Sequence, residues 1–176
     1  MMQIGTIKTL ASAVALLGMS GTAMAASGTG TSTSKVVSPI SITPTTALNF
    51  GKFASDGSGN TIVDMDTAGA VTCMGASLCG ANSPTPGTFD IVGTPGQLVD
   101  LSSPGNFFLS DGTNSVEVGN IVLSGSNVNI LGYFHSNGTL DTGGALSFKV
   151  TGSLWMTAGT PAGDFSGTYS VVVNYQ

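Results

Sequence analysis

Few residues in this chain could do chemistry, and the first to consider are His135 and Ser136. His135 is the only imidazole, and Ser136 beside it could serve as a nucleophile in a hydrolase. A hydrolytic triad needs its serine on a defined turn, with a base in hydrogen-bond reach and an acid that orients the base. The Ser-Asn-Gly sequence after His135 offers none of these. We therefore expect His135 to lie in a loop between strands, and we expect no catalytic residues and no enzyme activity.

Paired carboxylates are the second candidate chemistry. Asp64 and Asp66 would face the same side of a strand, where two carboxylates can share a proton or hold a cation. No third acid lies nearby, and the Asp56-x-Ser58-x-Asn60 stretch lacks the acidic residue that closes a calcium loop. Two cysteines and one histidine make no credible zinc set. We expect a solvated strand face and a glycine-rich turn, with no metal and no cofactor.

The two cysteines, Cys73 and Cys79, are expected to form a disulfide if the chain is exported to an oxidising compartment. Free thiols or a metal site remain the alternatives. The bridge would close a short loop, so its entropic stabilisation should be modest, about 2–3 kcal/mol.

The N-terminus has the pattern of a secretion leader. Residues 1–25 contain one lysine, an apolar run of about ten residues and a small-x-small ending at Ala25, which is typical of a cleaved signal peptide and too short to span a membrane. Residues 26–34 read as a flexible polar leader. We expect residues 35–176 to form a single domain, exported to the periplasm and onward to the cell surface or an extracellular fibre, with no integral membrane span.

The composition excludes some partners. The chain has four lysines and arginines together against nine acids, and only 7% of its residues are charged. A nucleic-acid-binding surface needs a basic footprint, so we expect no nucleic acid partner. The 41% hydrophobic content also argues against disorder, which goes with low hydrophobicity and high net charge.

Short apolar runs separated by turn residues indicate an all-β fold. No window of a dozen residues holds a helical stripe free of glycine and proline, apart from the leader. Many short strands at roughly 8–12-residue spacing are typical of a β-sandwich. The expected strands after the first are 61–65, 70–73, 89–93, 98–101, 107–109, 115–118, 121–123, 128–134, 145–156 and 168–175.

Two alternating stretches could mediate subunit contacts. In residues 35–43, Val36, Ile40 and Ile42 share one face of an extended ribbon, and Pro44-Thr45-Thr46 reads as a hinge after it. Near the other end, strict alternation puts four side chains on one face of a strand that is either held inside a sheet or presents an edge. These are Tyr169, Val171, Val173 and Tyr175.

Three motifs carry a family resemblance. They are Pro39-Ile40-Ser41-Ile42 with Leu48-Asn49-Phe50-Gly51, the F-x-V-x-G-x-P-G-like residues 89–96, and the terminal residues 163–175. With these motifs the chain resembles the family called domain of unknown function 4402, and more loosely the spore-coat-U domain and the archaic chaperone–usher pilins. The similarity spans most of Pro39 to Tyr175.

The pilin resemblance implies an immunoglobulin-like antiparallel sandwich that lacks one strand. In such fibres an N-terminal segment of a neighbouring subunit fills the gap, and a periplasmic chaperone contacts the C-terminal strand before an outer-membrane usher receives the subunit. The archaic pilins tend to bridge an early cysteine to the one at Val-Thr-Cys, whereas here Cys79 is the second cysteine.

We therefore expect a structural subunit of a pilus-like or surface fibre assembled by donor-strand complementation. Val36, Ile40 and Ile42 would be the donor face, and Tyr169, Val171, Val173 and Tyr175 the chaperone contact. The expected partners are copies of the chain or related subunits. The alternative is a monomeric adhesive or binding module at the cell surface whose own residues 36–42 complete its sandwich.

Overall fold

A computed structural model of the chain describes residues 27–103 and 105–176. It divides into two units, Met1–Lys35 and Val36–Gln176. The expected signal peptide, residues 1–25, lies outside the described residues. Of the first unit, residues 27–35 are exposed and belong to no strand.

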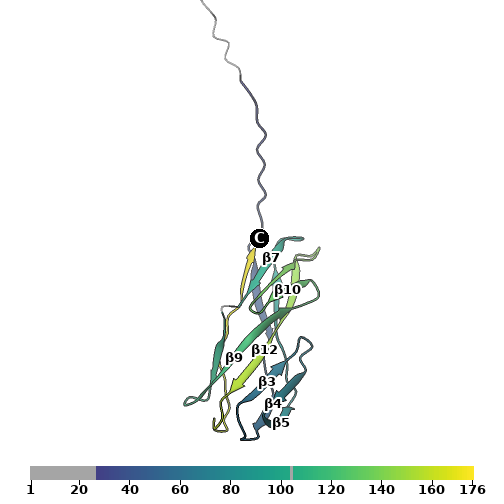
Figure 1. Ribbon diagram of the computed structural model, residues 1–176. Coiled ribbons are helices and arrows are strands. Elements are labelled where there is room, and N and C mark those ends of the chain that lie inside the picture. Colours follow the sequence, from purple (N-terminus) through teal and green to yellow (C-terminus); the bar gives the residue numbers. More distant parts are fainter. Residues whose placement is uncertain (1–26, 104) are drawn as a thin grey trace, which may run out of the picture. The chain divides into compact units, whose positions relative to one another are not determined.

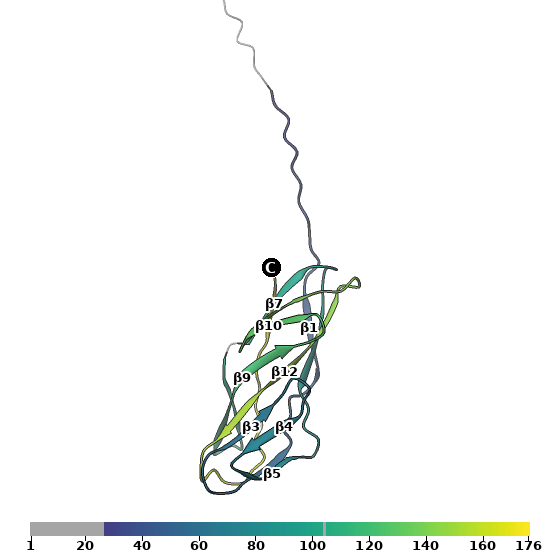
Figure 2. The same ribbon diagram turned by 45° about the vertical axis from the view of Figure 1, so that its right-hand side comes forward.

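All strands of the second unit pair antiparallel and its described residues contain no helix, which confirms the all-β prediction and fits a β-sandwich (Figures 1 and 2). The larger sheet contains β1 (Ser41–Thr46), β3 (Thr61–Met65), β4 (Val71–Met74), β6 (Gly87–Val92), β8 (Phe107–Ser110), β9 (Ser115–Ser124) and β12 (Ala145–Met156). The smaller sheet contains β7 (Leu98–Ser102), β10 (Val128–Gly132), β11 (His135–Thr139) and β13 (Val172–Tyr175). A separate two-stranded sheet pairs β2 (Lys52–Ser55) with β5 (Ala76–Ala81).

The long strand β12 organises the larger sheet. Its first half pairs with β6, its second half with β3, and its other edge with β9. Leu146, Phe148 and Val150 alternate with more exposed neighbours and point into the core, as the period of two in a strand requires. The strand predicted at 145–156 is thus confirmed with the same bounds, and its alternating apolar side chains form the buried face.

The smaller sheet has the order β10-β11-β7-β13, so the C-terminal strand lies at its edge. Val99 and Leu101 of β7 are wholly buried and join the core residues of β12, β6 and β9 in one cluster. In Figures 1 and 2 the yellow C-terminal segment runs along the sandwich from the end near β3 and β4 to the end near β7. It therefore flanks both sheets.

Several strand predictions need correction. His135 was expected in a loop, but it starts β11, because the turn falls earlier, at Tyr133 and Phe134, where Phe134 adopts a φ of 66°. The runs 115–118 and 121–123 form one strand, β9, which passes through Asn120 at a φ of 49°.

The hinge expected at Pro44-Thr45-Thr46 lies inside a strand. β1 begins at Ser41 and continues through Thr46, and the only irregularity is a register shift between Pro44 and Thr46. Proline is tolerated there because β1 is an edge strand.

Candidate functional site

An open groove lies between two extended segments of the sandwich. Residues 48–55 form one wall and residues 160–167 the other, and the space between them measures about 1090 Å³. The floor consists of apolar side chains from β8, β9 and β12: Leu109, Val116, Leu154 and Met156. We call this feature the interstrand groove.

The walls of the interstrand groove have free backbone edges. β2 pairs with β5 on one side only. Among the described residues, the segment 161–171 pairs through its backbone only at Ser166, with Ser110 at 2.8 and 3.0 Å. Exposed strand edges with unpaired N–H and C=O groups are templates for another strand. The groove thus combines an apolar floor with two edges that an inserted strand could pair with.

Tyr169 anchors the C-terminal segment just beyond the groove. Its ring stacks on Phe107, with ring centroids 5.1 Å apart, and meets Phe89 edge-on at 5.9 Å. Its hydroxyl lies over Gly87, where a Cβ would collide with it. Burial raises the pKa of Tyr169 to about 12, because the ring environment disfavours the phenolate.

Tyr175 fastens the opposite end of the sandwich. Its hydroxyl accepts a hydrogen bond from the Thr94 amide at 2.7 Å and donates one to the Ser38 carbonyl at 2.9 Å. The Ser38 amide in turn donates to Thr94 Oγ1 at 2.7 Å. The hydroxyl sits over Gly93, which also has no room for a Cβ. We call this three-residue junction of Ser38, Thr94 and Tyr175 the clasp.

The three sequence motifs therefore meet in space. The central motif supplies Phe89, Gly93 and Thr94, the terminal motif supplies the two tyrosines that pack on them, and Ser38 directly precedes the first motif. Residues 40–175 match the family described as Domain of unknown function (DUF4402). The chain belongs to the DUF4402 family. No curated protein and no solved structure is significantly similar to it. In this DUF4402 chain the three motifs lie in N-terminal, central and terminal segments that contact one another.

The expected donor residues occupy different environments in this DUF4402 chain. Val36 is 90% exposed, whereas Ile40 is half-buried and packs against the core. Ile42 lies in β1, paired with Ile91 of β6, and is 37% exposed. The three therefore do not form one free face: the ribbon is exposed up to Pro39, and from Ser41 it belongs to the larger sheet.

The four residues expected on one face of the terminal strand do share it. Tyr169, Val171, Val173 and Tyr175 are half-buried against the core. Only Val173 and Tyr175 lie within β13, which pairs with β7. Their shared chaperone role stays a prediction.

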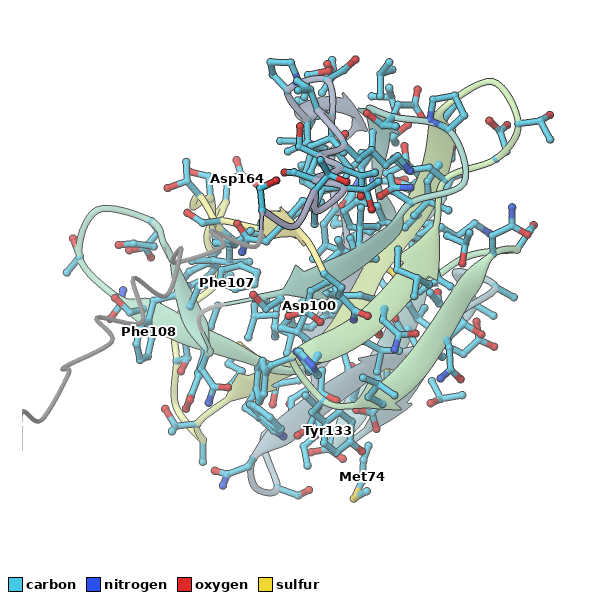
Figure 3. All side chains as sticks on the ribbon, turned by 90° about the horizontal axis from the view of Figure 1, so that it is seen from above. Met74, Asp100, Phe107, Phe108, Tyr133 and Asp164 are labelled. Atoms are coloured by element: carbon cyan, nitrogen blue, oxygen red, sulfur yellow. A yellow bond between two sulfur atoms is a disulfide. The ribbon has the colours of Figure 1, made fainter. Side chains whose placement is uncertain are left out.

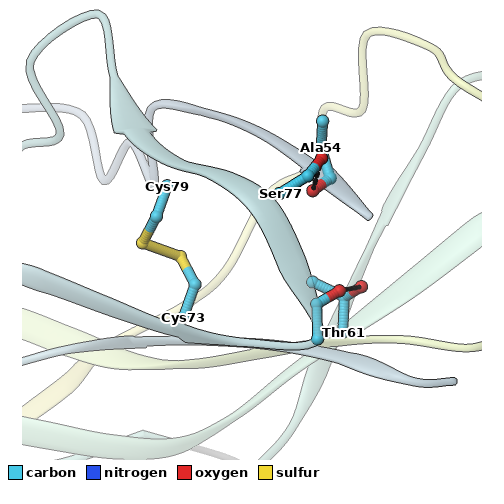
Figure 4. The surroundings of a disulfide bond; sticks show 6 residues. Ala54, Thr61, Cys73, Ser77 and Cys79 are labelled. Carbon is cyan, nitrogen blue, oxygen red and sulfur yellow. Dashed lines mark hydrogen bonds between the residues drawn. A yellow bond between two sulfur atoms is a disulfide. The ribbon is translucent and has the colours of Figure 1, made fainter. Parts of the chain in front are cut away.

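The disulfide between Cys73 and Cys79 is present, as predicted (Figure 4). It joins β4 to β5, and β5 is held to β2 by ladder bonds and by hydrogen bonds from the Ser77 hydroxyl. The bridge thus ties the two-stranded sheet, and with it one wall of the groove, to the larger sheet.

Two of the carboxylates considered for chemistry, those of Asp66 and Asp56, accept hydrogen bonds that close turns. Asp66 Oδ1 accepts hydrogen bonds from the amides of Ala68 and Ala70, both at 2.9 Å, and so closes the turn after β3. Asp56 accepts from the amide and hydroxyl of Ser58, and these bonds lower the pKa of its carboxyl. The described residues contain no cluster of three or more potential metal ligands.

His135 has one acidic neighbour. Its Nε2 lies 3.3 Å from Oδ1 of Asp100, and both side chains are partly exposed. The hydroxyl of Ser136 points the other way and donates to the Leu123 carbonyl at 2.7 Å. The two residues therefore face opposite sides of β11 and do not form a nucleophile–base pair. Figure 3 shows Asp100 on its strand, with Tyr133, Met74 and Phe108 at the periphery.

The sequence reasoning missed the groove walls and the glycines under the two tyrosines. Gly87 and Gly93 have the same spacing as Tyr169 and Tyr175, and this shared interval was the available signal. Among the described residues no helix is long and apolar enough to cross a membrane.

Proposed function

We propose that this chain is an exported structural subunit of a pilus-like or surface fibre, in which the interstrand groove takes an extended segment of a neighbouring copy. The observation that carries the proposal is the groove itself. Each of its two walls, residues 48–55 and 160–167, has one backbone edge that is largely unpaired, beside an apolar floor. A strand added there would gain ladder hydrogen bonds from backbone groups and register from alternate side chains.

The energetic case rests on many small terms. Each ladder hydrogen bond contributes about 0.5–1.5 kcal/mol net. An inserted strand with two partners forms such bonds along both edges. A chaperone would contact the C-terminal strand at Tyr169, Val171, Val173 and Tyr175 before assembly, and an outer-membrane usher would receive the subunit. The leader pattern of residues 1–25 supports export.

The test uses the secreted chain, with its N-terminus established by peptide sequencing. Electron microscopy and sedimentation in sodium dodecyl sulfate should reveal fibres that resist dissociation, and deletion of residues 27–37 should abolish them while the thermal midpoint of the folded body stays close to that of the parent. A secreted chain that stays monomeric at every concentration would contradict the proposal, whereas undiminished fibres from the deletion variant would show only that the lent segment lies outside residues 27–37.

A second function is favoured by a separate observation. Pairing of β1 with β6 and the clasp at Ser38 use the chain's own N-terminal residues, as in a monomeric surface or binding module with a self-complete sandwich. This function predicts a single monomeric species in sedimentation equilibrium at every concentration, and no fibres.

A further inference from the structure

Residues from Ser38 onward are engaged by the chain's own body. The clasp holds Ser38 through both its amide and its carbonyl. Ile40 packs on the core, and β1 then pairs with β6 from Ser41 to Thr46. Lending these residues to a neighbour would break the clasp and a whole ladder. Residues 27–37, by contrast, are all exposed and belong to no strand. We call these residues the N-terminal arm.

The floor of the groove favours small side chains. Val116 and Leu154 are each 2% exposed and Met156 is 8% exposed, although all three line the groove. They are already covered by their neighbours, so large apolar side chains of an inserted strand would find little further apolar surface to bury there. The walls also carry polar groups, including Asn49, Ser55 and others. A strand with short, partly polar side chains fits this surface better than a run of isoleucines.

The N-terminal arm has such side chains at strand spacing. Thr29, Thr31 and Thr33 occupy every second position, so they share one face of an extended chain, which ends with Lys35 and Val37 next to the clasp. Threonine is β-branched and favours strands, and it presents both a methyl group and a hydroxyl. The opposite face carries glycine and serine up to Ser34.

The N-terminal arm is too short to fill the groove of its own subunit. From the clasp at Ser38, about ten residues of mostly extended chain, roughly 30 Å, lead along β1 to the near end of the groove at Leu48. The groove walls are about eight residues long, roughly 26 Å. With the leader removed after Ala25, as the export proposal requires, about twelve residues precede Ser38 and span at most roughly 43 Å, so they end before they could turn back and fill the groove of the same body.

We infer that the segment lent to a neighbouring copy is the N-terminal arm, Ser27–Val37, with its threonine face toward the groove, and that each subunit keeps its own β1. This inference rests on the fibre function proposed above. It replaces the donor face of Val36, Ile40 and Ile42 by the residues that lie before the clasp.

The experiment compares two synthetic peptides as ligands and competitors of the full secreted chain. One peptide is Ser27–Val37 and the other is Val36–Thr43, each carrying a fluorophore for anisotropy. The secreted chain is unfolded, then refolded with each peptide in excess, and fibre yield is measured. We expect Ser27–Val37 to bind at least roughly tenfold more tightly than Val36–Thr43 and to lower fibre yield more strongly.

The outcomes separate the inference from the function on which it rests. Tighter binding of Val36–Thr43 overturns the inference and leaves the fibre function standing. Fibres without binding of either peptide overturn the inference too. A chain that stays monomeric and binds neither peptide overturns both.

Paired variants of the full chain test the docking face without altering the folded body. Thr31→Asp with Thr33→Asp should lower fibre yield at least several-fold, whereas Ser32→Asp with Ser34→Asp adds the same charge on the opposite face and should leave most of it. Equal loss in both variants overturns the assignment of the threonine face. Equal thermal midpoints check that both variants fold.

Discussion

The clasp provides the sharpest quantitative test of the fold, through the variant Tyr175→Phe. The change removes only the hydroxyl, which accepts from the Thr94 amide and donates to the Ser38 carbonyl. Two hydrogen bonds at about 0.5–1.5 kcal/mol each give an upper range of about 3 kcal/mol. The Ser38 carbonyl belongs to an exposed residue and regains water, so we expect a loss of about 1–2 kcal/mol in the free energy of unfolding.

Two measurements check this expectation. Urea unfolding should give the loss directly, and the thermal midpoint should fall by about 2–8 °C. Amide hydrogen exchange should speed up at Thr94, whose N–H loses its acceptor. It should also speed up at Ser38, whose N–H still donates to Thr94, because local opening of the clasp then breaks fewer hydrogen bonds.

The matched control is Tyr133→Phe. Tyr133 is 60% exposed and its hydroxyl makes no hydrogen bond among the described residues, so the same chemical change should alter stability by less than about 0.5 kcal/mol. A Tyr175→Phe variant as stable as this control, with unchanged exchange at Thr94, would refute the role of the hydroxyl in holding the chain's N-terminal segment.

Three further predictions follow from the core and the disulfide. Replacing Cys73 and Cys79 together by serine should lower the free energy of unfolding by about 2–3 kcal/mol, measured by urea unfolding against the oxidised parent, because the bridge closes a loop of only a few residues; equal midpoints would contradict this. Gly93→Ala should cost about 1–3 kcal/mol, since the new methyl would collide with the clasp hydroxyl and lie 3.0 Å from a Leu140 methyl carbon, whereas Gly59→Ala, in open space, should be nearly neutral. Stability should fall between about pH 10 and about pH 12, because burial raises the pKa of Tyr169 to about 12 while the unfolded phenol titrates near 10. The stabilisation is complete below pH 10, and Tyr169→Phe should flatten this part of the curve in unfolding experiments at graded pH.

The strands with a clear buried face were the most predictable part of the fold. The 145–156 run gives β12 with the bounds predicted, because Leu146, Phe148 and Val150 alternate without interruption. The disulfide could also be predicted, since only two cysteines exist and they lie close together in the chain.

Strands without an apolar period escaped prediction. β11 has the sequence His-Ser-Asn-Gly-Thr and β5 the sequence Ala-Ser-Leu-Cys-Gly-Ala. β11 is extended because β10 and β7 pair with it on both sides, and β5 is extended because β2 pairs with one of its edges. Local propensity does not reveal these neighbours. The groove could not be predicted from the sequence for a related reason. It is formed by residues 48–55 and 160–167, which are far apart in the chain and become walls only when the sandwich is assembled.

The packing of two tyrosines over two glycines fixes the number of residues between these contacts as well as the contacts themselves. Tyr169 and Tyr175 lie over Gly87 and Gly93, one pair near each end of β6. The central and terminal segments must therefore keep equal intervals between their anchor residues. A residue inserted in either segment would turn the following side chains to the other face and leave one hydroxyl without its glycine. Insertions in loops outside residues 87–93 and 169–175 leave both intervals intact, so these two segments are where a change of length would be least tolerated.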